Sequence, residues 1–340
     1  MPRTVTLAAG LETSALGFGC AGLFREPSRK IRVRLLETAY EVGIRHFDVA
    51  PMYGLGIAEQ ELGRVFRGRR DSVVIATKFG IEPTLAARQL ARVQAPIRRL
   101  LRAIPTLRQQ MISRAAGPAS GTVGGLLYRS PCYDGASASA SLEASLGEIG
   151  TDYVDLLLLH DPTLGAVSSD DVCAFLEGAR DAGHIRTWGI AGDPVATMEV
   201  AGSFPDVVPV LQLRDDIFLR SLRSLEPAPA SGLITFGALG RALAQLVTYV
   251  RAEPKRYRRW NATIGADCGD PRTLAPLLLR DAFRENADGT VLFSTVHADR
   301  MRVAAAEADA RPDAPDRTPD PFRALVEAEA TFAQSTTSRG

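Results

Sequence analysis

Apolar runs of the β type alternate with helical patterns along most of this chain, and that alternation restricts the fold more than any other feature. Parallel strands need a crossover to return the chain, and a helix usually supplies it. Two of the runs, VDLLLL and SVVIAT, are apolar on both faces, as in a sheet that is covered on both sides. The expected strands are 16–20, 44–48, 73–78, 153–160, 186–191, 207–213, 233–236 and 290–293.

Helical periodicity fills intervals between these strands, at 30–42, 58–66, 137–149, 170–182, 195–203 and 271–285. For a chain of 340 residues, this order predicts a closed (β/α)8 TIM barrel, with a doubly wound open sheet as the alternative. We assign residues 1–310 to the barrel and 311–340 to a C-terminal tail. In the tail, a Pro/Asp-rich linker precedes a short helix at 322–332.

The loop after the third strand is far longer than a crossover requires. Its residues 84–134 contain eight arginines and almost no acidic side chain, and residues 88–104 show an arginine face opposite an apolar face. We expect a basic helical insert. It is either a lid over the barrel mouth with solvated arginines, or a surface that recruits an anionic substrate or an acidic carrier protein.

Charge and cysteine content exclude several functional classes. The formal net charge is +1, so no overall field favours nucleic acid or a membrane surface. The four cysteines are far apart and show no zinc-ligand spacing, which favours free thiols in a reducing compartment. The N-terminus lacks an apolar signal region, and no segment is apolar enough to span a bilayer. We therefore expect a cytoplasmic protein.

Three consecutive expected strands end on ionisable residues: Asp48, Lys78 and His160. In a barrel, these carboxyl ends lie side by side on the face that carries active sites. Tyr53, in the loop after the second strand, can fold back over the same place. Each residue alone has an ordinary structural role, but only three lysines exist and one stands at the required strand end.

These four side chains form a coherent proton-transfer device. An ammonium beside a phenol favours the phenolate and should lower the pKa of Tyr53, and a paired carboxylate keeps the lysine in place. The histidine can donate a hydrogen bond to a substrate oxygen. The set has no nucleophile, metal or electron sink, so an external hydride carrier would complete it.

The segments GIRHFDVAPMYGLGIAEQELG, VVIATKFG, SLGEIGTDYVDLLLLHDP and GHIRTWGIAG closely resemble the aldo-keto reductases, in order and spacing, over roughly residues 14–305. The resemblance implies a (β/α)8 barrel that binds NADP(H), less often NAD(H). It also implies that Tyr53 is the general acid/base, that Lys78 and Asp48 tune it, and that His160 orients the carbonyl. The motifs are most similar to the subgroup of sugar dehydrogenases, so a sugar or a biosynthetic aldehyde or ketone is the expected substrate.

The same resemblance implies a set of cofactor contacts, some of which depart from the family pattern. Ala191-Gly192 stands where relatives carry Ser-Asn, and Ser294 and Thr295 remain without the family's lysine. Arg300 suits a ribose 2′-phosphate, so NADP(H) is favoured over NAD(H). The expected cofactor-binding residues are Gly19, Cys20, Gly192, Gln212, Phe236, Gly237, Leu239, Thr295 and Arg300. For Cys20 the alternative is an ordinary core position.

Two other functions stay open at this point. The altered amide clamp allows a barrel of this kind that performs elimination or isomerisation, and a non-catalytic binding subunit is the third hypothesis. The intact tetrad argues against that third hypothesis. His46 and Asp48 share one strand face, but no third ligand beyond His160 is evident, so we expect a buried structural histidine and no metal.

Overall fold

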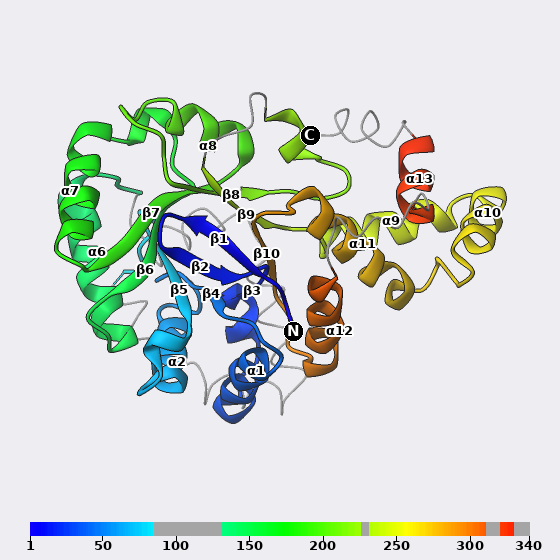
Figure 1. The fold of residues 1–340 in the computed structure, drawn as a ribbon, viewed down its shortest axis with the longest axis horizontal. Coiled ribbons are helices and arrows are strands. Elements are labelled where there is room, and N and C mark those ends of the chain that lie inside the picture. Colours follow the sequence, from blue (N-terminus) through cyan, green and yellow to red (C-terminus); the bar gives the residue numbers. More distant parts are fainter. Residues whose placement is uncertain (85–130, 226–230, 311–319, 330–340) are drawn as a thin grey trace, which may run out of the picture.

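Eight parallel strands close into a barrel in this computed structural model, which describes residues 1–84, 131–225, 231–310 and 320–329 (Figure 1). The order around the barrel follows the sequence, and the last strand pairs with the first. Closure confirms the predicted (β/α)8 barrel and excludes the open sheet. The barrel strands are β3 (Leu16–Gly19), β4 (His46–Asp48), β5 (Val74–Phe79), β6 (Val154–His160), β7 (Ile185–Gly192), β8 (Val210–Arg214), β9 (Gly232–Phe236) and β10 (Thr290–Phe293).

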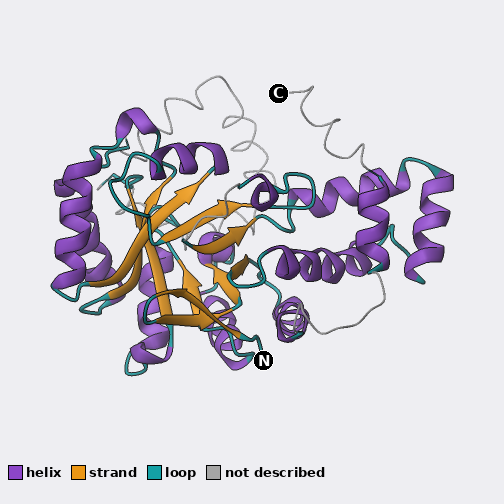
Figure 2. Ribbon diagram, turned by 45° about the horizontal axis from the view of Figure 1, so that its top comes forward, coloured by secondary structure: helices purple, strands orange, loops and turns teal. Residues whose placement is uncertain are grey.

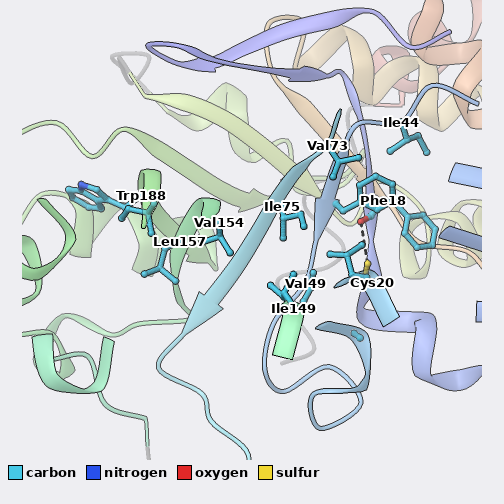
Figure 3. Packing of buried hydrophobic residues seen from close by; sticks show 14 of the residues in the cluster. Phe18, Cys20, Ile44, Val49, Val73, Ile75, Ile149, Val154, Leu157 and Trp188 are labelled. Carbon is cyan, nitrogen blue, oxygen red and sulfur yellow. Dashed lines mark hydrogen bonds between the residues drawn. The ribbon is translucent and has the colours of Figure 1, made fainter. Parts of the chain in front are cut away.

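A ring of helices covers the outer face of the barrel (Figure 2). The six helices predicted between the strands are confirmed, with ends shifted by at most two residues. The barrel helices are α1 (Arg29–Glu41), α2 (Ile57–Phe66), α6 (Gly135–Ile149), α7 (Ser169–Asp181), α8 (Pro194–Ala201), α11 (Pro271–Glu285) and α12 (Ala298–Asp309). The largest apolar cluster fills the layer between strands and helices, where Phe18, Val49 and Ile75 meet Ile149 and Leu157 (Figure 3).

An N-terminal hairpin that was not predicted from the sequence closes the amino-terminal end of the barrel. Strands β1 (Thr4–Ala8) and β2 (Leu11–Ser14) pair antiparallel around a turn in which Gly10 has a φ of 73°. Leu7 and Leu11 are buried against the inward-facing side chains of β5, β6 and β8. The backbone of Leu7 lies so close to Gly232 that a β-carbon there would overlap it.

A helical lobe stands beside the barrel, at the right of Figure 1. It consists of α9 (Arg241–Arg251), α10 (Pro254–Ile264) and α13 (Pro321–Ala328), packed with α11 around fully buried Trp260 and Phe322. Glu329, directly after α13, joins this helix to α9 and α10 by accepting hydrogen bonds from Tyr249 and Arg259. The short helix expected in the tail is therefore present as α13, whereas α9 and α10 were not predicted.

Most of the predicted basic insert, residues 85–130, lies outside the described residues, as do 311–319 and 330–340 of the tail. The two described ends of the insert meet at the end of β5, where Cys132 N donates to Gly80 O over 3.3 Å. Within the residues that the structure describes, no helix has the length and apolar character needed to cross a membrane.

Helices α2 and α6 touch at a glycine, and this contact gives a test of the packing. A β-carbon at Gly63 would overlap the carbonyl of Ile149, whereas one at Gly147 of α6 would meet no heavy atom within 4 Å. Gly63→Ala should lower the free energy of unfolding by about 1–3 kcal/mol through overpacking. Gly147→Ala should raise it by about 0.5–1 kcal/mol because alanine loses less backbone entropy. Urea unfolding of the matched pair measures both, and equal effects would contradict the described contact.

Candidate active site

The carboxyl ends of β4, β5 and β6 bring three of the four predicted catalytic residues together. Asp48 ends β4, Lys78 lies near the end of β5, and His160 ends β6. The Lys78 ammonium lies 2.5 Å from Asp48 Oδ2 and 3.2 Å from the carbonyl of Val49. Both side chains of this ion pair are only 3% exposed. The pair is thus held inside the barrel mouth, with water largely excluded.

Tyr53 reaches the same place from the loop after β4. The chain turns sharply behind it, because Gly54, Leu55 and Gly56 all have positive φ values. The Lys78 ammonium lies 5.2 Å from the centre of the Tyr53 ring, and that ring stands edge-on to the His160 ring, with centroids 6.0 Å apart. All four predicted catalytic side chains therefore converge.

Burial reverses one electrostatic expectation. Desolvation raises the pKa of Tyr53, and the lowering effect of Lys78 only partly offsets it. The expected net decrease is therefore wrong for this state of the protein, and the phenol keeps its proton at neutral pH. Burial pulls the pKa of Lys78 down, but Asp48 and Tyr53 outweigh burial, so the pKa is raised and the ammonium stays charged.

His160 is a neutral imidazole at neutral pH. Its side chain is buried, and desolvation together with the nearby Lys78 charge lowers its pKa to about 3. Nδ1 has no hydrogen-bond partner in the described part of the chain, and Nε2 lies 3.9 Å from Asp161 Oδ2. A neutral ring can still donate one N–H to a substrate oxygen.

Gln212 belongs to this site in a way that the sequence did not indicate. It was predicted as a cofactor contact, yet its Nε2 donates to Asp48 Oδ2 over 3.0 Å. Asp48 therefore accepts from Lys78 and Gln212 at once. The Oε1 of Gln212, which is buried, has no partner among the residues that the structure describes, and it can accept a hydrogen bond from a ligand.

Tyr133 is a second residue of the site that was not predicted from the sequence. Its hydroxyl donates to the carbonyl of His160 over 2.5 Å and lies 3.2 Å from the carbonyl of Asp161. Its ring lies against Gly80, where a β-carbon would overlap it. Tyr133 stood inside the predicted insert, and no local pattern distinguished it there.

The predicted cofactor residues divide between the barrel mouth and the core. Ser294 Oγ donates to Gly19 O over 2.6 Å. A β-carbon at Gly19 would lie 2.5 Å from Ser294 Oγ, so the serine side chain lies directly against the glycine. The Cys20 side chain is fully buried, with Sγ 3.9 Å from the carbonyl of Phe18. This corresponds to the core alternative rather than to a side-chain contact with the cofactor.

The remaining predicted cofactor residues lie at the ends of β7, β9 and β10. A β-carbon at Gly192 would lie 2.9 Å from Asp161 Oδ1 and 3.2 Å from Thr197 Oγ1. Phe236 and Leu239 are half-buried, and Gly237 between them has a φ of 100°. Thr295 Oγ1 accepts from the backbone N–H of His297, immediately before α12, and Arg300 is exposed in the first turn of that helix.

His46 has the structural role that its position suggested. It is fully buried, and desolvation and Lys78 lower its pKa to about 3. Neither ring nitrogen has a hydrogen-bond partner in the described ranges. Those ranges contain no group of three side chains that could together bind a metal ion.

The chain is similar to known proteins in both sequence and fold. A model of the Aldo/keto reductase family matches residues 15–215. D-threo-aldose 1-dehydrogenase from a Pseudomonas species is 29% identical over 259 residues, which are 74% of this chain and 72% of that protein. Pyridoxal 4-dehydrogenase from Microbacterium luteolum is 32% identical over 200 residues, which are 53% of this chain and 52% of that protein.

Solved structures share the whole fold. The holo form of the aldo-keto reductase AKR11C1 from Bacillus halodurans superposes with a TM-score of 0.68 at 18% identity, covering 98% of this chain and 97% of that one. An aldo-keto reductase from Klebsiella pneumoniae in complex with NADPH gives a TM-score of 0.63 at 19% identity, covering 96% and 95%. At these identities the likeness concerns the fold.

The low pKa values of His46 and His160 predict a specific pH response. Both rings should stay neutral between pH 7.5 and 5, since each folded-state pKa is about 3. The unfolded chain takes up these protons below its pKa of about 6.5. The free energy of unfolding should therefore fall by up to about 1.4 kcal/mol per pH unit for each ring as the pH drops from 6.5 toward 3.

Histidine ring NMR signals, assigned by single His→Asn substitutions, measure the protonation, and urea unfolding at pH 7 and pH 5 measures the stability. A ring that gains its proton near pH 6.5 in the folded protein would contradict the described burial.

Proposed function

Because this chain belongs to the Aldo/keto reductase family, we propose that it catalyses reversible hydride transfer between a nicotinamide cofactor and a carbonyl/alcohol substrate. The observation that supports this most is the convergence of Tyr53, Lys78, Asp48 and His160 at neighbouring strand ends. This arrangement delivers a proton to an oxygen atom at neutral pH. It provides no side-chain nucleophile for another class of chemistry.

In the direction of reduction, Tyr53 donates its phenolic proton to the substrate oxygen. The Lys78 ammonium, 5.2 Å from the centre of the tyrosine ring, stabilises the phenolate that forms. Asp48 keeps that ammonium in place at 2.5 Å and limits the cost of burying it. His160 donates a hydrogen bond that orients the substrate oxygen. In oxidation, the same groups take the proton from the alcohol.

The residues present fit a nicotinamide cofactor, whose chemistry is to supply or accept the hydride. The buried Oε1 of Gln212 needs a donor, which a carboxamide N–H provides. The close approach of Gly19 and Ser294 would hold the cofactor beside β3 and β10. The backbone N–H groups at the start of α12 and the Arg300 guanidinium favour the additional phosphate of NADP(H), although Asp299 in the same turn opposes it. The NADPH complex of the Klebsiella protein supports this preference.

The names of two relatives indicate small carbonyl or alcohol substrates: an aldose for one and pyridoxal for the other. We therefore propose a small, polar carbonyl/alcohol pair, such as a sugar, as the substrate class. An elimination or isomerisation that uses no nicotinamide cofactor would not explain the unpaired Oε1 of Gln212 or the proposed phosphate contact at the start of α12. For this reason the redox reaction is the stronger proposal.

Removal of the Tyr53 hydroxyl tests the proposed proton donor. Tyr53→Phe should lower kcat by about 10²–10⁴-fold with each carbonyl substrate, because proton transfer is lost. Fluorescence titration should show Kd values for NADPH and NADH within about twofold of wild type. Tyr153→Phe is a matched control, since Tyr153 donates a hydrogen bond to Asp71 at the other end of β6. Retained activity in Tyr53→Phe would remove that residue from its role.

Arg300 tests the preference for NADP(H). Arg300→Ala should weaken NADPH binding about tenfold, which is roughly 1.4 kcal/mol for one charge-assisted contact, and leave NADH nearly unchanged. Arg258→Ala, an exposed arginine on α10, serves as the control for loss of one positive charge. Equal weakening of both nucleotides would contradict the phosphate contact. Failure of wild type to bind either nucleotide at micromolar concentrations would contradict the redox proposal.

A further inference from the structure

Asp161 follows His160 directly and stands beside its imidazole in an unusual backbone conformation. Its φ is 48°, a left-handed value that only two other non-glycine residues adopt in the described part of the chain, Leu55 and Arg220. Such a conformation is strained for a residue with a side chain and is found preferentially at functional sites. The backbone N–H of Asp161 donates to the carbonyl of Ala191 over 2.7 Å, which joins this residue to the end of β7.

Tyr133 fixes the peptide units on both sides of this conformation. Its hydroxyl contacts the carbonyls of His160 and Asp161 at 2.5 and 3.2 Å, and its own ring is 1% exposed. The backbone that carries both the imidazole and the carboxylate is consequently held in place. A fixed backbone limits where the carboxylate can lie, which a residue that discriminates between substrates requires.

The Asp161 carboxylate lies beside the His160 imidazole, close to Gly192 at the end of β7, and is accessible. Oδ2 lies 3.9 Å from His160 Nε2, and the side chain remains 59% exposed. Among the described residues, no arginine or lysine pairs with it. A carboxylate can only accept hydrogen bonds, so a ligand group that satisfies it must be a donor.

We propose that Asp161 is a specificity-determining residue that selects substrates with a hydroxyl group on the carbon next to the carbonyl, such as aldoses and other α-hydroxy aldehydes. This inference rests on the proposed reaction, in which the carbonyl oxygen binds His160. A vicinal hydroxyl oxygen lies about 3 Å from the carbonyl oxygen, and each hydrogen bond spans about 2.8 Å. A substrate held by the imidazole can therefore also reach the carboxylate 3.9 Å away from it.

The Asp161 carboxylate disfavours a negative charge on the substrate carbon next to the carbonyl. Two anionic groups at such a short distance repel each other. The site would therefore exclude substrates that carry an anionic group on the carbon next to the carbonyl. Of the substrate classes that the sequence left open, the hydroxylated carbonyl is compatible with Asp161. An anionic group is acceptable only farther from the reacting carbon.

Two substitutions at Asp161 separate its charge from its backbone conformation. Asp161→Asn keeps the shape and tolerates a left-handed φ. Asp161→Gly removes the side chain and has no steric cost at φ 48°. Asp288→Asn, an exposed aspartate in the turn before β10, serves as the control. Each full-length variant is assayed with NADPH on glycolaldehyde and acetaldehyde, which differ only in the vicinal hydroxyl, and on glyoxylate, which places a carboxylate there.

Wild type and Asp288→Asn should prefer glycolaldehyde to acetaldehyde. In Asp161→Gly, the kcat/KM for glycolaldehyde divided by that for acetaldehyde should fall by about 10–100-fold, chiefly because the KM for glycolaldehyde rises. Asp161→Asn should lie between them because its amide oxygen still accepts. Both Asp161 variants should use glyoxylate better than wild type does. The Kd for NADPH should stay within about twofold.

An unchanged substrate ratio in Asp161→Gly would overturn the inference while leaving the proposed reaction intact. A large increase in the Kd for NADPH, with equal losses for both aldehydes, would assign the carboxylate to the cofactor and overturn it as well. Wild type that binds NADPH but reduces none of the carbonyls would instead contradict the proposed reaction, and this inference with it.

Discussion

The buried ion pair of Asp48 and Lys78 is the interaction on which the whole site depends. Two charges that are 3% exposed are costly to bury, and removal of one partner from such a pair typically costs about 3–5 kcal/mol. The closed barrel makes the pair tolerable, because it places Val49 O and Gln212 Nε2 within hydrogen-bonding distance of the two charges. The pair in turn sets the electrostatic conditions for Tyr53 and His160. Fold stability and proton chemistry therefore share the same few side chains.

The charge of Lys78 acts on three neighbours with different results. It adds to desolvation, the larger effect, in lowering the pKa of His160 and of His46, so both rings stay neutral. It opposes, but does not overcome, the effect of burial on the Tyr53 phenol. The resting site thus contains a protonated phenol, a neutral imidazole and a single balanced cation. This is the protonation state that the proposed proton transfer to a carbonyl requires.

The barrel and the tetrad were predictable from the sequence because both depend on local patterns: strand runs, helical intervals, and ionisable residues at strand ends. The features that sequence reasoning missed depend on contacts between distant segments. Tyr133 reaches His160, Gln212 reaches Asp48, and Glu329 reaches the lobe that α9 and α10 form. The direction of the Tyr53 pKa was missed for the same reason, since burial is a property of the assembled fold. The left-handed Asp161 had no sequence signal, because aspartate is common in ordinary turns.

The meeting of the two insert ends at the end of β5 has an evolutionary consequence. The chain leaves the barrel after Gly80 and returns at Cys132, whose N–H donates to that same residue, so the intervening segment begins and ends at one point. A segment attached in this way can lengthen, shorten or be exchanged without moving Lys78 on one side or Tyr133 and His160 on the other. Such modularity lets new specificities be acquired by loop replacement while the chemical step is inherited unchanged.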